Sequence, residues 1–390
     1  MEKFFIIGGN SLNGEVKIDS AKNALLPIIA ACILVEGEVM LEDVPKYSDV
    51  LAMCKILENL GGKTCWRDNS LVINCKNLDK NEVPNHLSSP VRSSIFTLGA
   101  ILGRMKKAKV SYPGGCDIGL RPIDIHINGL KTLGVNIVEK NGYIYADGTK
   151  AKSTTFTLPF ASVGATENLI MLACLTKGTT KIINPAKEPE IEDLQNFLNK
   201  CGACIKGAGT SEIVIEGVKK LKGTTFKAIP DRIETGTFLI ATAMTKGKVL
   251  LKNTLPSHNK ILIDLLCKSG SKIKTYKNDI LIENKIRPNS FGEVETAVYP
   301  GFSTDLQPQL MALASVSNGC SVICENLFEA RFKHVSELKK MGAQIKCKNG
   351  IAIITGKEKL YGADVTSTDL RGGASLILAG LSAEGYTTID

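Results

Sequence analysis

One thiol of this chain stands in a segment whose residue types favour chemistry over packing. Cys116 is flanked by Gly114, Gly115 and Gly119, and Arg121 follows five residues later. Glycine permits positive φ and a close approach of backbone to ligand, whereas cysteines used for packing sit inside apolar runs. A neighbouring cation makes a thiol more reactive, and Arg121 would supply one. We predict a catalytic or gating thiol at Cys116; a buried thiol in a tight turn is the alternative.

The arginines are few and concentrated in motifs. Only eight of the 48 basic residues are Arg, so the chain otherwise uses Lys. Because the planar guanidinium grips carboxylate and phosphate bidentately, these exceptions indicate binding roles. Five of the eight lie in the motifs described below: Arg92, Arg121, Arg232, Arg331 and Arg371.

Composition bounds the class of protein. With 390 residues the chain exceeds one comfortable core, so we expect two domains. The net charge of +9 is compatible with nucleic acid, anionic lipid or an anionic small substrate. Aromatic residues make up only 5% and the charge is dispersed, so nucleic acid ranks last. The longest nearly apolar run, residues 24–35, is too short to span a membrane, so we expect no membrane contact.

Cysteine usage indicates the compartment and argues against a metal. Twelve cysteines without a recognisable signal peptide predict a reducing, cytoplasmic location. Cys201 and Cys204 resemble half of a zinc or redox motif, but no second pair lies at ligand spacing. We therefore expect no metal and no cofactor. The four histidines are also scattered, at positions 86, 126, 258 and 334.

The elements that must position these residues recur. A unit of about 70 residues contains a small-residue apolar helix, a strand, an amphipathic helix ending in glycine, and a strand pair. The apolar helices should be buried, and amphipathic helices such as 50–60 should cover half-buried sheets. Six units, three per domain, predict an α/β (α+β) fold. The apolar helices begin near residues 23, 92, 165, 233, 305 and 370, and the closing glycines are Gly61, Gly134, Gly202, Gly270 and Gly342.

The two ends of the array are irregular. Residues 4–18 have the pattern of a strand, a turn and a strand, like the end of a unit whose beginning is absent, and the sixth unit stops at Asp390. The simplest interpretation is that the N-terminus completes the sixth unit, which then lacks roughly 20 to 30 residues of a full repeat. We expect one domain over 22–229, carrying the Cys116 loop, and a discontinuous domain over 1–21 plus 230–390.

Polar residues that packing does not require stand where the apolar helices begin. Helix N-termini carry partial positive charge and free N–H groups, so several such ends facing one cleft between the domains would bind a polyanion. Ordinary N-caps and surface arginines are the alternative for one or two of these positions. The residues are Lys22, Asn23, Arg92, Ser162, Val163, Gly164, Asp231, Arg232, Thr304, Asp305, Asp369 and Arg371.

These motifs resemble, along essentially the whole chain, those of the UDP-N-acetylglucosamine enolpyruvyl transferases. The resemblance implies two domains that each form an inside-out α/β barrel of three repeated units. It also implies transfer of the enolpyruvyl group of phosphoenolpyruvate to the 3'-hydroxyl of UDP-N-acetylglucosamine with release of phosphate, the first committed step of peptidoglycan synthesis. The motifs occupy residues 20–24, 113–116, 121–124, 162–168, 230–234, 300–307, 328–334 and 369–371.

The resemblance implies roles for individual residues. Cys116 would protonate C3 of phosphoenolpyruvate and would react with the epoxide fosfomycin, and Asp305 would accept the proton of the attacking hydroxyl. Lys22 would belong to the catalytic set as well. Phosphoenolpyruvate would be bound by Lys22, Asn23, Arg121, Arg331 and Arg371. UDP-N-acetylglucosamine would be bound by Asn23, Arg92, Arg121, Pro122, Ile123, Asp124, Ile125, Ser162, Val163, Gly164, Asp305 and Leu327.

Some positions depart from the family pattern, and two other functions stay open. Asp117, Phe160 and Ser303 replace commoner residues, and the chain ends before the family's final segment, which supplies a further substrate-binding arginine. A non-catalytic nucleotide-sugar-binding protein is therefore one alternative. The other is the enolpyruvyl transferase of the shikimate pathway, which shares the fold but lacks a cysteine loop of this type.

Overall fold

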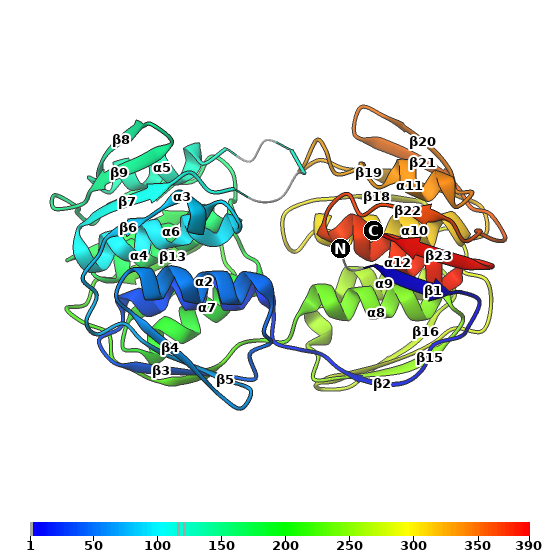
Figure 1. Cartoon of the computed structure of the whole chain (residues 1–390), viewed down its shortest axis with the longest axis horizontal. Coiled ribbons are helices and arrows are strands. Elements are labelled where there is room, and N and C mark those ends of the chain that lie inside the picture. The colour runs from blue at the N-terminus through cyan, green and yellow to red at the C-terminus, as the bar shows by residue number, and fades with distance from the viewer. Residues whose placement is uncertain (1–2, 115–117, 120–121) are drawn as a thin grey trace. The chain divides into compact units, whose positions relative to one another are not determined.

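The computed structural model describes residues 3–114, 118–119 and 122–390, which fold into two compact units (Figure 1). The middle unit contains residues 19–115 and 121–229, and the discontinuous unit contains residues 1–18, 116–120 and 230–390. The domain limits expected from the sequence, 22–229 against 1–21 plus 230–390, stay a prediction.

Three four-stranded sheets of the middle unit, counted over its described residues, share one strand order. An edge strand pairs parallel with the first strand of the repeat, and the remaining two strands pair antiparallel, as in β14-β3-β5-β4, β6-β7-β9-β8 and β10-β11-β13-β12. The last strand of the unit, β14, pairs with its first, β3, in the register Thr225↔Met40. The strands are β3 (Glu38–Glu42), β4 (Lys63–Arg67), β5 (Ser70–Asn74), β6 (Glu82–Val83), β7 (Lys107–Ser111), β8 (Asn136–Lys140), β9 (Tyr143–Asp147), β10 (Thr155–Thr157), β11 (Thr179–Ile183), β12 (Cys204–Lys206), β13 (Glu212–Glu216) and β14 (Thr225–Lys227).

The helices of the middle unit are of the two expected kinds. The apolar ones are buried along nearly their whole length, because their small and aliphatic residues leave no polar face. They are α1 (Lys22–Ala31), which continues into η1 (Cys32–Leu34), α4 (Phe96–Met105), which follows η2 (Arg92–Ile95), and α6 (Val163–Cys174). The amphipathic ones are α2 (Ser48–Asn59), α5 (Asp124–Thr132) and α7 (Pro189–Lys200), and α3 (Asn85–Ser88) is a short turn of helix.

The discontinuous unit repeats the same strand order in two of its sheets, β16-β17-β15-β2 and β18-β19-β21-β20. A third sheet has the order β1-β23-β22, in which β22 pairs parallel and β1 antiparallel with β23. The strands are β1 (Phe4–Ile7), β2 (Asn13–Lys17), β15 (Lys248–Lys252), β16 (Lys272–Thr275), β17 (Asp279–Glu283), β18 (Glu293–Glu295), β19 (Cys320–Cys324), β20 (Gln344–Lys348), β21 (Ile351–Thr355), β22 (Asp364–Val365) and β23 (Tyr386–Ile389).

The N-terminal segment corrects one expectation. Both expected strands form, but β1 and β2 belong to different sheets and do not pair with each other. β1 lies antiparallel to β23, whereas β2 lies parallel to β15 in the register Lys248↔Asn13. The connection between them is held by other elements, since Gly9 donates its N–H to Leu381 O and Lys248 donates to Leu12 O.

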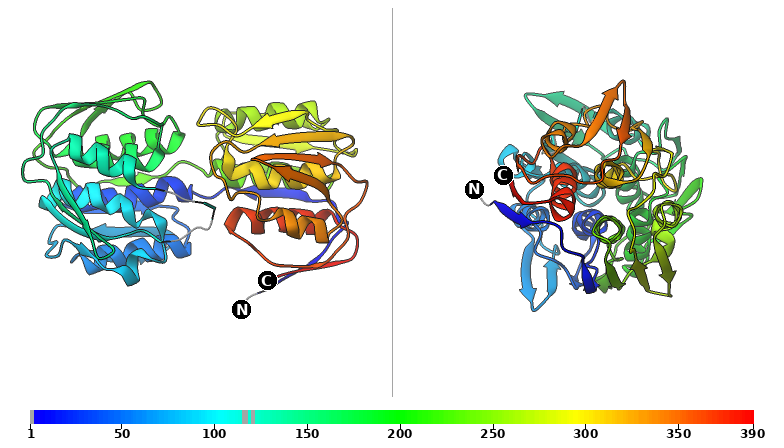
Figure 2. Two further views of the ribbon diagram at one scale, coloured as in Figure 1. Left: turned by 90° about the horizontal axis from the view of Figure 1, so that it is seen from above. Right: turned by 90° about the vertical axis from the view of Figure 1, so that its right-hand side faces the viewer.

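The helices of the discontinuous unit follow the same division. Helices α8, α10 and α12 contact one another and run side by side with the strands outside them (Figure 2). Their buried residues form a hydrophobic cluster that shares no member with the cluster of the middle unit. The helices are α8 (Arg232–Met244), η3 (Pro256–Asn259), α9 (Lys260–Lys268), η4 (Thr304–Leu306), α10 (Gln307–Val316), α11 (Val335–Lys340) and α12 (Leu370–Ser382).

The closing glycines of the amphipathic helices are confirmed. All five have positive φ, between 86° and 104°, as the left-handed residue after a helix requires. A side chain at these positions would be strained, which explains why a glycine follows each of these five helices.

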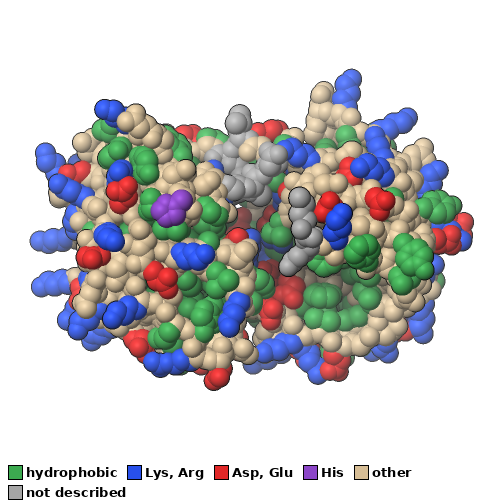
Figure 3. Space-filling view, viewed as in Figure 1, with side chains coloured by type: hydrophobic (Ala, Val, Ile, Leu, Met, Phe, Trp, Pro, Cys, Tyr) green, Lys and Arg blue, Asp and Glu red, His purple; other side chains and the backbone are tan. Residues whose placement is uncertain are grey.

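Charge is dispersed over the face of the molecule that Figure 3 shows. On the face shown in Figure 3, Lys and Arg side chains are mixed with acidic and apolar ones rather than gathered in one patch. Within the described ranges, no helix is both long enough and apolar enough to cross a membrane.

Candidate active site

A charged cluster in the discontinuous unit joins three of the predicted site residues. Asp305 lies in η4, and its backbone N–H is capped by the Ser303 hydroxyl at 3.2 Å. Arg371 is the second residue of α12. Asp369 caps the N-terminus of this helix, because its carboxylate accepts the N–H groups of Arg371 and Gly372 at 3.1 and 3.2 Å. These caps fix the backbone directly beside each charged side chain, because N-capping satisfies otherwise unpaired N–H groups.

Asp305 is held between two guanidinium groups. Nη2 of Arg331 lies 2.6 Å from Oδ1 of Asp305, and Nη2 of Arg371 lies 3.4 Å from Oδ2 of the same carboxylate. Arg331 is only 1% exposed, whereas the Asp305 side chain is 27% exposed. The Asp305 carboxylate is therefore partly exposed to solvent, whereas the Arg331 guanidinium that binds it is buried.

The buried arginine has two further partners. Its Nη1 lies 3.5 Å from Oδ1 of Asp369, and its Nε donates to Thr304 O at 3.3 Å. A buried guanidinium is tolerated only when carboxylates and carbonyls compensate its charge. Two carboxylates and one carbonyl thus fix Arg331 from two chain segments, and through it the position of Asp305.

A neutral histidine backs this cluster. His334 follows Arg331 by one turn and is fully buried. Burial lowers the pKa of His334 to about 4, although the nearby Asp369 carboxylate opposes this effect. The imidazole is therefore uncharged near neutral pH and adds no positive charge beside Arg331.

Leu327, expected on the sugar side, is fixed by a buried glutamate. The Leu327 N–H donates to Oε1 of Glu325 at 3.0 Å, and the Thr304 hydroxyl donates to Oε2 of the same residue at 2.9 Å. Glu325 thereby links the Leu327 turn to η4, which carries Asp305. A hollow of about 570 Å³ adjoins this turn. It is lined by Glu325, Asn326, Leu327, Phe328, Glu329, Asn349 and Gly350.

The middle unit holds a second group of predicted residues at helix starts. Lys22 is the first residue of α1, its side chain is 23% exposed, and its Nζ lies 2.8 Å from Oδ2 of Asp49. Asn23 follows it and is half-buried. The ammonium is thus held at the N-terminus of a buried helix by a carboxylate from the first turn of α2.

The residues expected to bind the nucleotide sugar begin three other helical segments of this unit. Arg92 begins η2, Asp124 and Ile125 begin α5, and the Ser162 hydroxyl caps α6 through a 3.4 Å bond from Ala165 N–H. Val163 and Gly164 form the first turn of α6. Immediately before α5, Pro122 is exposed and Ile123 is buried.

Two important predictions lie outside the described residues, namely Cys116 and Arg121. The glycines next to them are partly described. Gly119 has a φ of 127°, and a Cβ added to Gly114 would lie 2.1 Å from Ser89 O. Both positions therefore require glycine, as the sequence suggested for this loop.

Sequence reasoning did not single out Asp369 or Asp49 as site residues. Asp369 appeared only as a residue at a helix start, yet it bonds to Arg331 as well as capping α12. Asp49 lies 27 residues from Lys22, and nothing in the spacing of the two residues indicates the ion pair. The sequence did contain a signal that could have identified Asp369 as a site residue, because it is an acidic N-cap two residues before Arg371, a predicted ligand-binding arginine.

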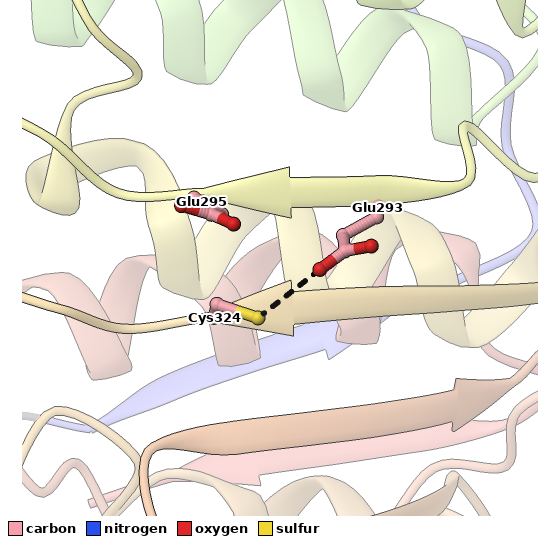
Figure 4. A group of neighbouring side chains, drawn as sticks. All are labelled: Glu293, Glu295 and Cys324. Carbon is pink, nitrogen blue, oxygen red and sulfur yellow. Dashed lines mark hydrogen bonds between the residues drawn. The ribbon is translucent and has the colours of Figure 1, made fainter.

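Metal-ligating side chains come together at one place among the residues the structure describes. Glu293 and Glu295 on β18 lie beside Cys324 on β19, with ligand atoms within 4.8 Å of one another (Figure 4). The Cys324 thiol donates to Oε1 of Glu293 at 3.7 Å, and both glutamates are exposed. Exposed acidic groups of this kind are common without a metal, so the group carries no functional assignment.

Comparison with known proteins places the whole chain in one group. The profile of the family described as EPSP synthase (3-phosphoshikimate 1-carboxyvinyltransferase) matches residues 6–390. A Caldanaerobacter subterraneus subsp. tengcongensis protein named UDP-N-acetylglucosamine 1-carboxyvinyltransferase 2 is 48% identical over 390 residues, which cover 100% of this chain and 94% of that protein. The Coxiella burnetii UDP-N-acetylglucosamine 1-carboxyvinyltransferase is 44% identical over 393 residues, covering 100% and 90%.

Solved structures show the same fold. The enolpyruvyl transferase NikO from Streptomyces tendae has a TM-score of 0.88 at 23% identity, over 99% of this chain and 92% of that one. The EPSP synthase from Acinetobacter baumannii has a TM-score of 0.74 at 20% identity, over 100% and 94%. At these identities the likeness concerns the fold alone, a mixed α/β architecture of many sheets.

Proposed function

The chain belongs to the EPSP synthase family, and we propose that it is a UDP-N-acetylglucosamine 1-carboxyvinyltransferase of peptidoglycan synthesis. It transfers the enolpyruvyl group of phosphoenolpyruvate to the 3'-hydroxyl of UDP-N-acetylglucosamine and releases phosphate. Relatives of this name match the full chain at 44 to 48% identity. The proposed reaction needs no cofactor.

The observation that carries the proposal is the carboxylate of Asp305 between Arg331 and Arg371. A base for a sugar hydroxyl and cations for a carboxylate and a phosphate are the groups this transfer needs. The partly exposed carboxylate would accept the proton of the 3'-hydroxyl. The two guanidiniums would bind phosphoenolpyruvate while orienting that carboxylate.

The proposed reaction is an addition followed by an elimination. The Cys116 thiol gives a proton to C3 of phosphoenolpyruvate, and C2 becomes electrophilic as the C2–C3 double bond is lost. The 3'-oxygen of the sugar forms a bond to C2, and its proton passes to Asp305, giving a tetrahedral ketal. The Cys116 thiolate takes a proton back from C3, which restores the double bond, and the bond between C2 and the phosphate oxygen breaks. Phosphate leaves with the proton that Asp305 held.

The middle unit would supply the remaining binding groups. We assign Lys22, with Asn23 and Arg121, to phosphoenolpyruvate, since an ammonium at a helix start favours an anion. The helix starts that carry Arg92, Asp124 and Ser162 would bind the nucleotide sugar through N–H groups and side chains. The remaining members of the proposed nucleotide-sugar set are Asn23, Arg121, Pro122, Ile123, Ile125, Val163 and Gly164, together with Asp305 and Leu327 of the discontinuous unit.

We also propose a more detailed description of the fold than the α/β architecture shared with the solved structures. We infer that six repeated units form two inside-out barrels, three units in each domain. The support is the strand order shared by the five four-stranded sheets, together with three buried apolar helices in each unit. In the sheet β1-β23-β22 the N-terminal strand takes the place that β5, β9, β13, β17 and β21 have in the other sheets.

One assay tests the function. The 390-residue protein is mixed with both substrates and phosphate release is followed, with each substrate alone as a control. We expect release only with both, and little release from Cys116→Ala or Asp305→Ala at unchanged unfolding temperature. Binding of the nucleotide sugar without any release would contradict the enzymatic proposal and favour a non-catalytic binding protein. Release with 3-phosphoshikimate in place of the nucleotide sugar would favour the shikimate-pathway enzyme instead.

A further inference from the structure

Three segments of the middle unit carry the residues assigned to the nucleotide sugar, and they come from distant parts of the chain. Arg92 begins η2, which runs into α4, Asp124 begins α5, and Ser162 caps α6. A site built from three helix starts works only if their relative positions are held to a fraction of an ångström. The side chain that could hold them together is Asn168, in the second turn of α6.

Asn168 is fully buried and bonds to all three segments. Its Oδ1 accepts the Gly99 N–H of α4 at 2.7 Å, and its Nδ2 donates to Ile95 O of η2 at 3.1 Å. The same Nδ2 lies 2.9 Å from Nδ1 of His126 in α5 and 3.4 Å from Gly164 O in the first turn of α6. Because an amide nitrogen only donates, Nδ1 of His126 must be the acceptor, and its ring proton is therefore on Nε2.

Two glycines, which have no side chain, permit these short contacts between the helices. A Cβ added to Gly99 would lie 2.3 Å from Asn168 O and 2.8 Å from its Oδ1. A Cβ added to Gly164 would lie 2.9 Å from Cε1 of His126. The two glycines therefore bring the helices close enough for one amide to reach all of them.

The bonds from Nδ2 of Asn168 end at or close to assigned binding residues. Ile95 is the last residue of the 3₁₀ turn that Arg92 begins, and His126 directly follows Ile125. Gly164 is itself one of the assigned residues. Lys22 is not among the groups that bond to Asn168, and it forms an ion pair with Asp49 on α2. A change at Asn168 should therefore displace the nucleotide-sugar groups far more than the phosphoenolpyruvate groups.

We propose that Asn168 is a positioning residue for the nucleotide-sugar site, whose amide fixes the starts of η2, α5 and α6 relative to one another. It does not touch the substrate in this assignment; it acts through Arg92, Ile125 and Gly164. The inference rests on the proposed function, because it assigns those residues to UDP-N-acetylglucosamine. It goes beyond that function by naming the side chain that sets the affinity for one substrate and not for the other.

The primary test is Asn168→Asp, which keeps the size of the side chain and the acceptor for Gly99 but loses the bonds from Nδ2 to Ile95 O, His126 Nδ1 and Gly164 O. We expect the KM for UDP-N-acetylglucosamine to rise about 10-fold or more, while the KM for phosphoenolpyruvate changes less than about 3-fold. The matched control is Asn284→Asp. Asn284 is another buried amide, and it donates to Ala243 O at 2.7 Å and Ile286 O at 3.0 Å in the discontinuous unit. The Asn284→Asp variant should lose about as much stability as Asn168→Asp, but the ratio of its two KM values should stay that of the wild type.

A second pair of variants keeps the test decisive if Asn168→Asp does not fold. His126→Asn offers an amide oxygen near the position of Nδ1 and should keep the KM for the nucleotide sugar within about 3-fold, whereas His126→Leu should raise it selectively. Equal rises of both KM values, or a selective rise in Asn284→Asp as well, would overturn the proposal. So would an unchanged KM in folded Asn168→Asp. A wild-type protein that neither binds nor converts the nucleotide sugar would instead refute the proposed function itself.

Discussion

At the scale of single residues, Asp369 has two tasks that a pair of substitutions separates. It caps α12 through the Arg371 and Gly372 N–H groups and also faces the buried Arg331. Asn caps a helix about as well as Asp, so Asp369→Asn should keep the cap and lose only the charge, whereas Asp369→Ala loses both. Urea unfolding should show the Ala variant about 1 kcal/mol less stable than the Asn variant.

The same two variants should be similarly impaired in activity. Without the Asp369 charge, Arg331 is compensated by Asp305 alone and binds that carboxylate more tightly, which makes it a poorer base. Phosphate release should therefore fall about 10-fold in both variants. Ser367→Ala, which removes an exposed hydroxyl bonded to Asp369 O, is the control and should retain full activity. Full activity in Asp369→Asn would show that the charge has no role in the site.

Asp193 on α7 predicts a pH dependence of stability. Burial raises its pKa to about 7, although the Ile229 N–H, which donates at 3.1 Å, opposes this rise. The folded state therefore holds a proton that the unfolded state has lost between about pH 4 and pH 7, so the free energy of unfolding falls as pH rises through that window. The loss is at most about 4 kcal/mol for such a shift.

Asp193→Asn should remove this part of the pH dependence while keeping an acceptor for Ile229. Its stability relative to the wild type should increase from about pH 4 to about pH 7 and then level off. Burial also raises the pKa of Glu167, with Glu190 and Glu188 adding to the rise, so a weaker decline of the same sign should persist in the variant. Chemical denaturation at several pH values measures the difference, and parallel curves for both proteins would refute the assignment.

Individual side chains differ in how far the sequence could predict them. The cationic residues at helix starts were recognisable because the chain uses few arginines and places them in repeated positions. Their carboxylate partners were not, since an acidic residue at a helix start already has a sufficient explanation as a cap. Which of those acids also bonds to a distant arginine, as Asp369 does to Arg331, depends on tertiary packing that spacing does not encode.

At the scale of elements, the close approach of α4 and α6 depends on Gly99. A Cβ at this position would lie 2.3 Å from the backbone oxygen of Asn168, which cannot move without shifting the helix. Gly99→Ala should therefore destabilise the protein by about 1 to 3 kcal/mol despite the better helix propensity of Ala. Thermal unfolding with a matched helical glycine measures this effect.

Gly380 in α12 is the matched glycine. A Cβ there would meet side-chain atoms of Ile6 and Thr387 at 3.2 to 3.4 Å, a contact that a shift of a few tenths of an ångström relieves. Gly380→Ala should be neutral or stabilising by up to about 1 kcal/mol, because Ala favours the helix. Equal effects of the two substitutions would show that helix propensity, and not the distance between α4 and α6, sets the result.

The order of elements was largely predictable, and their partners were less so. Apolar periodicity and the closing glycines located the buried and amphipathic helices, because those signals are local. The pairing of β1 with β23 and of β2 with β15 is set by residues more than 200 positions away in the sequence. A short segment such as 8–12 has the same composition whether it turns the chain back or carries it to another sheet.

At the scale of the whole molecule, each unit has a hydrophobic core of its own. The two clusters of buried residues share no member. The chain passes between the units at residues 18–19 and 229–230, and also on either side of residues 118–119. Two cores of this size are what a chain of 390 residues requires, since a single core does not grow indefinitely. The strand order common to five sheets further suggests that equivalent positions in the two units contribute similarly to stability.

Leu57 and Leu266 form such an equivalent pair. Each is fully buried, each stands four residues before a closing glycine, and each backbone carbonyl accepts a bond from beyond that glycine, from Gly62 at 2.9 Å and from Ser271 at 3.0 Å. Either Leu→Ala change should cost about 2 to 5 kcal/mol in its own core. Hydrogen exchange followed by mass spectrometry should then show lower protection in peptides of the middle unit for Leu57→Ala and of the discontinuous unit for Leu266→Ala. Equal loss of protection along the whole chain in both variants would contradict this expectation and mean that the two cores unfold together. In that case, calorimetry of the double variant should show a single unfolding transition.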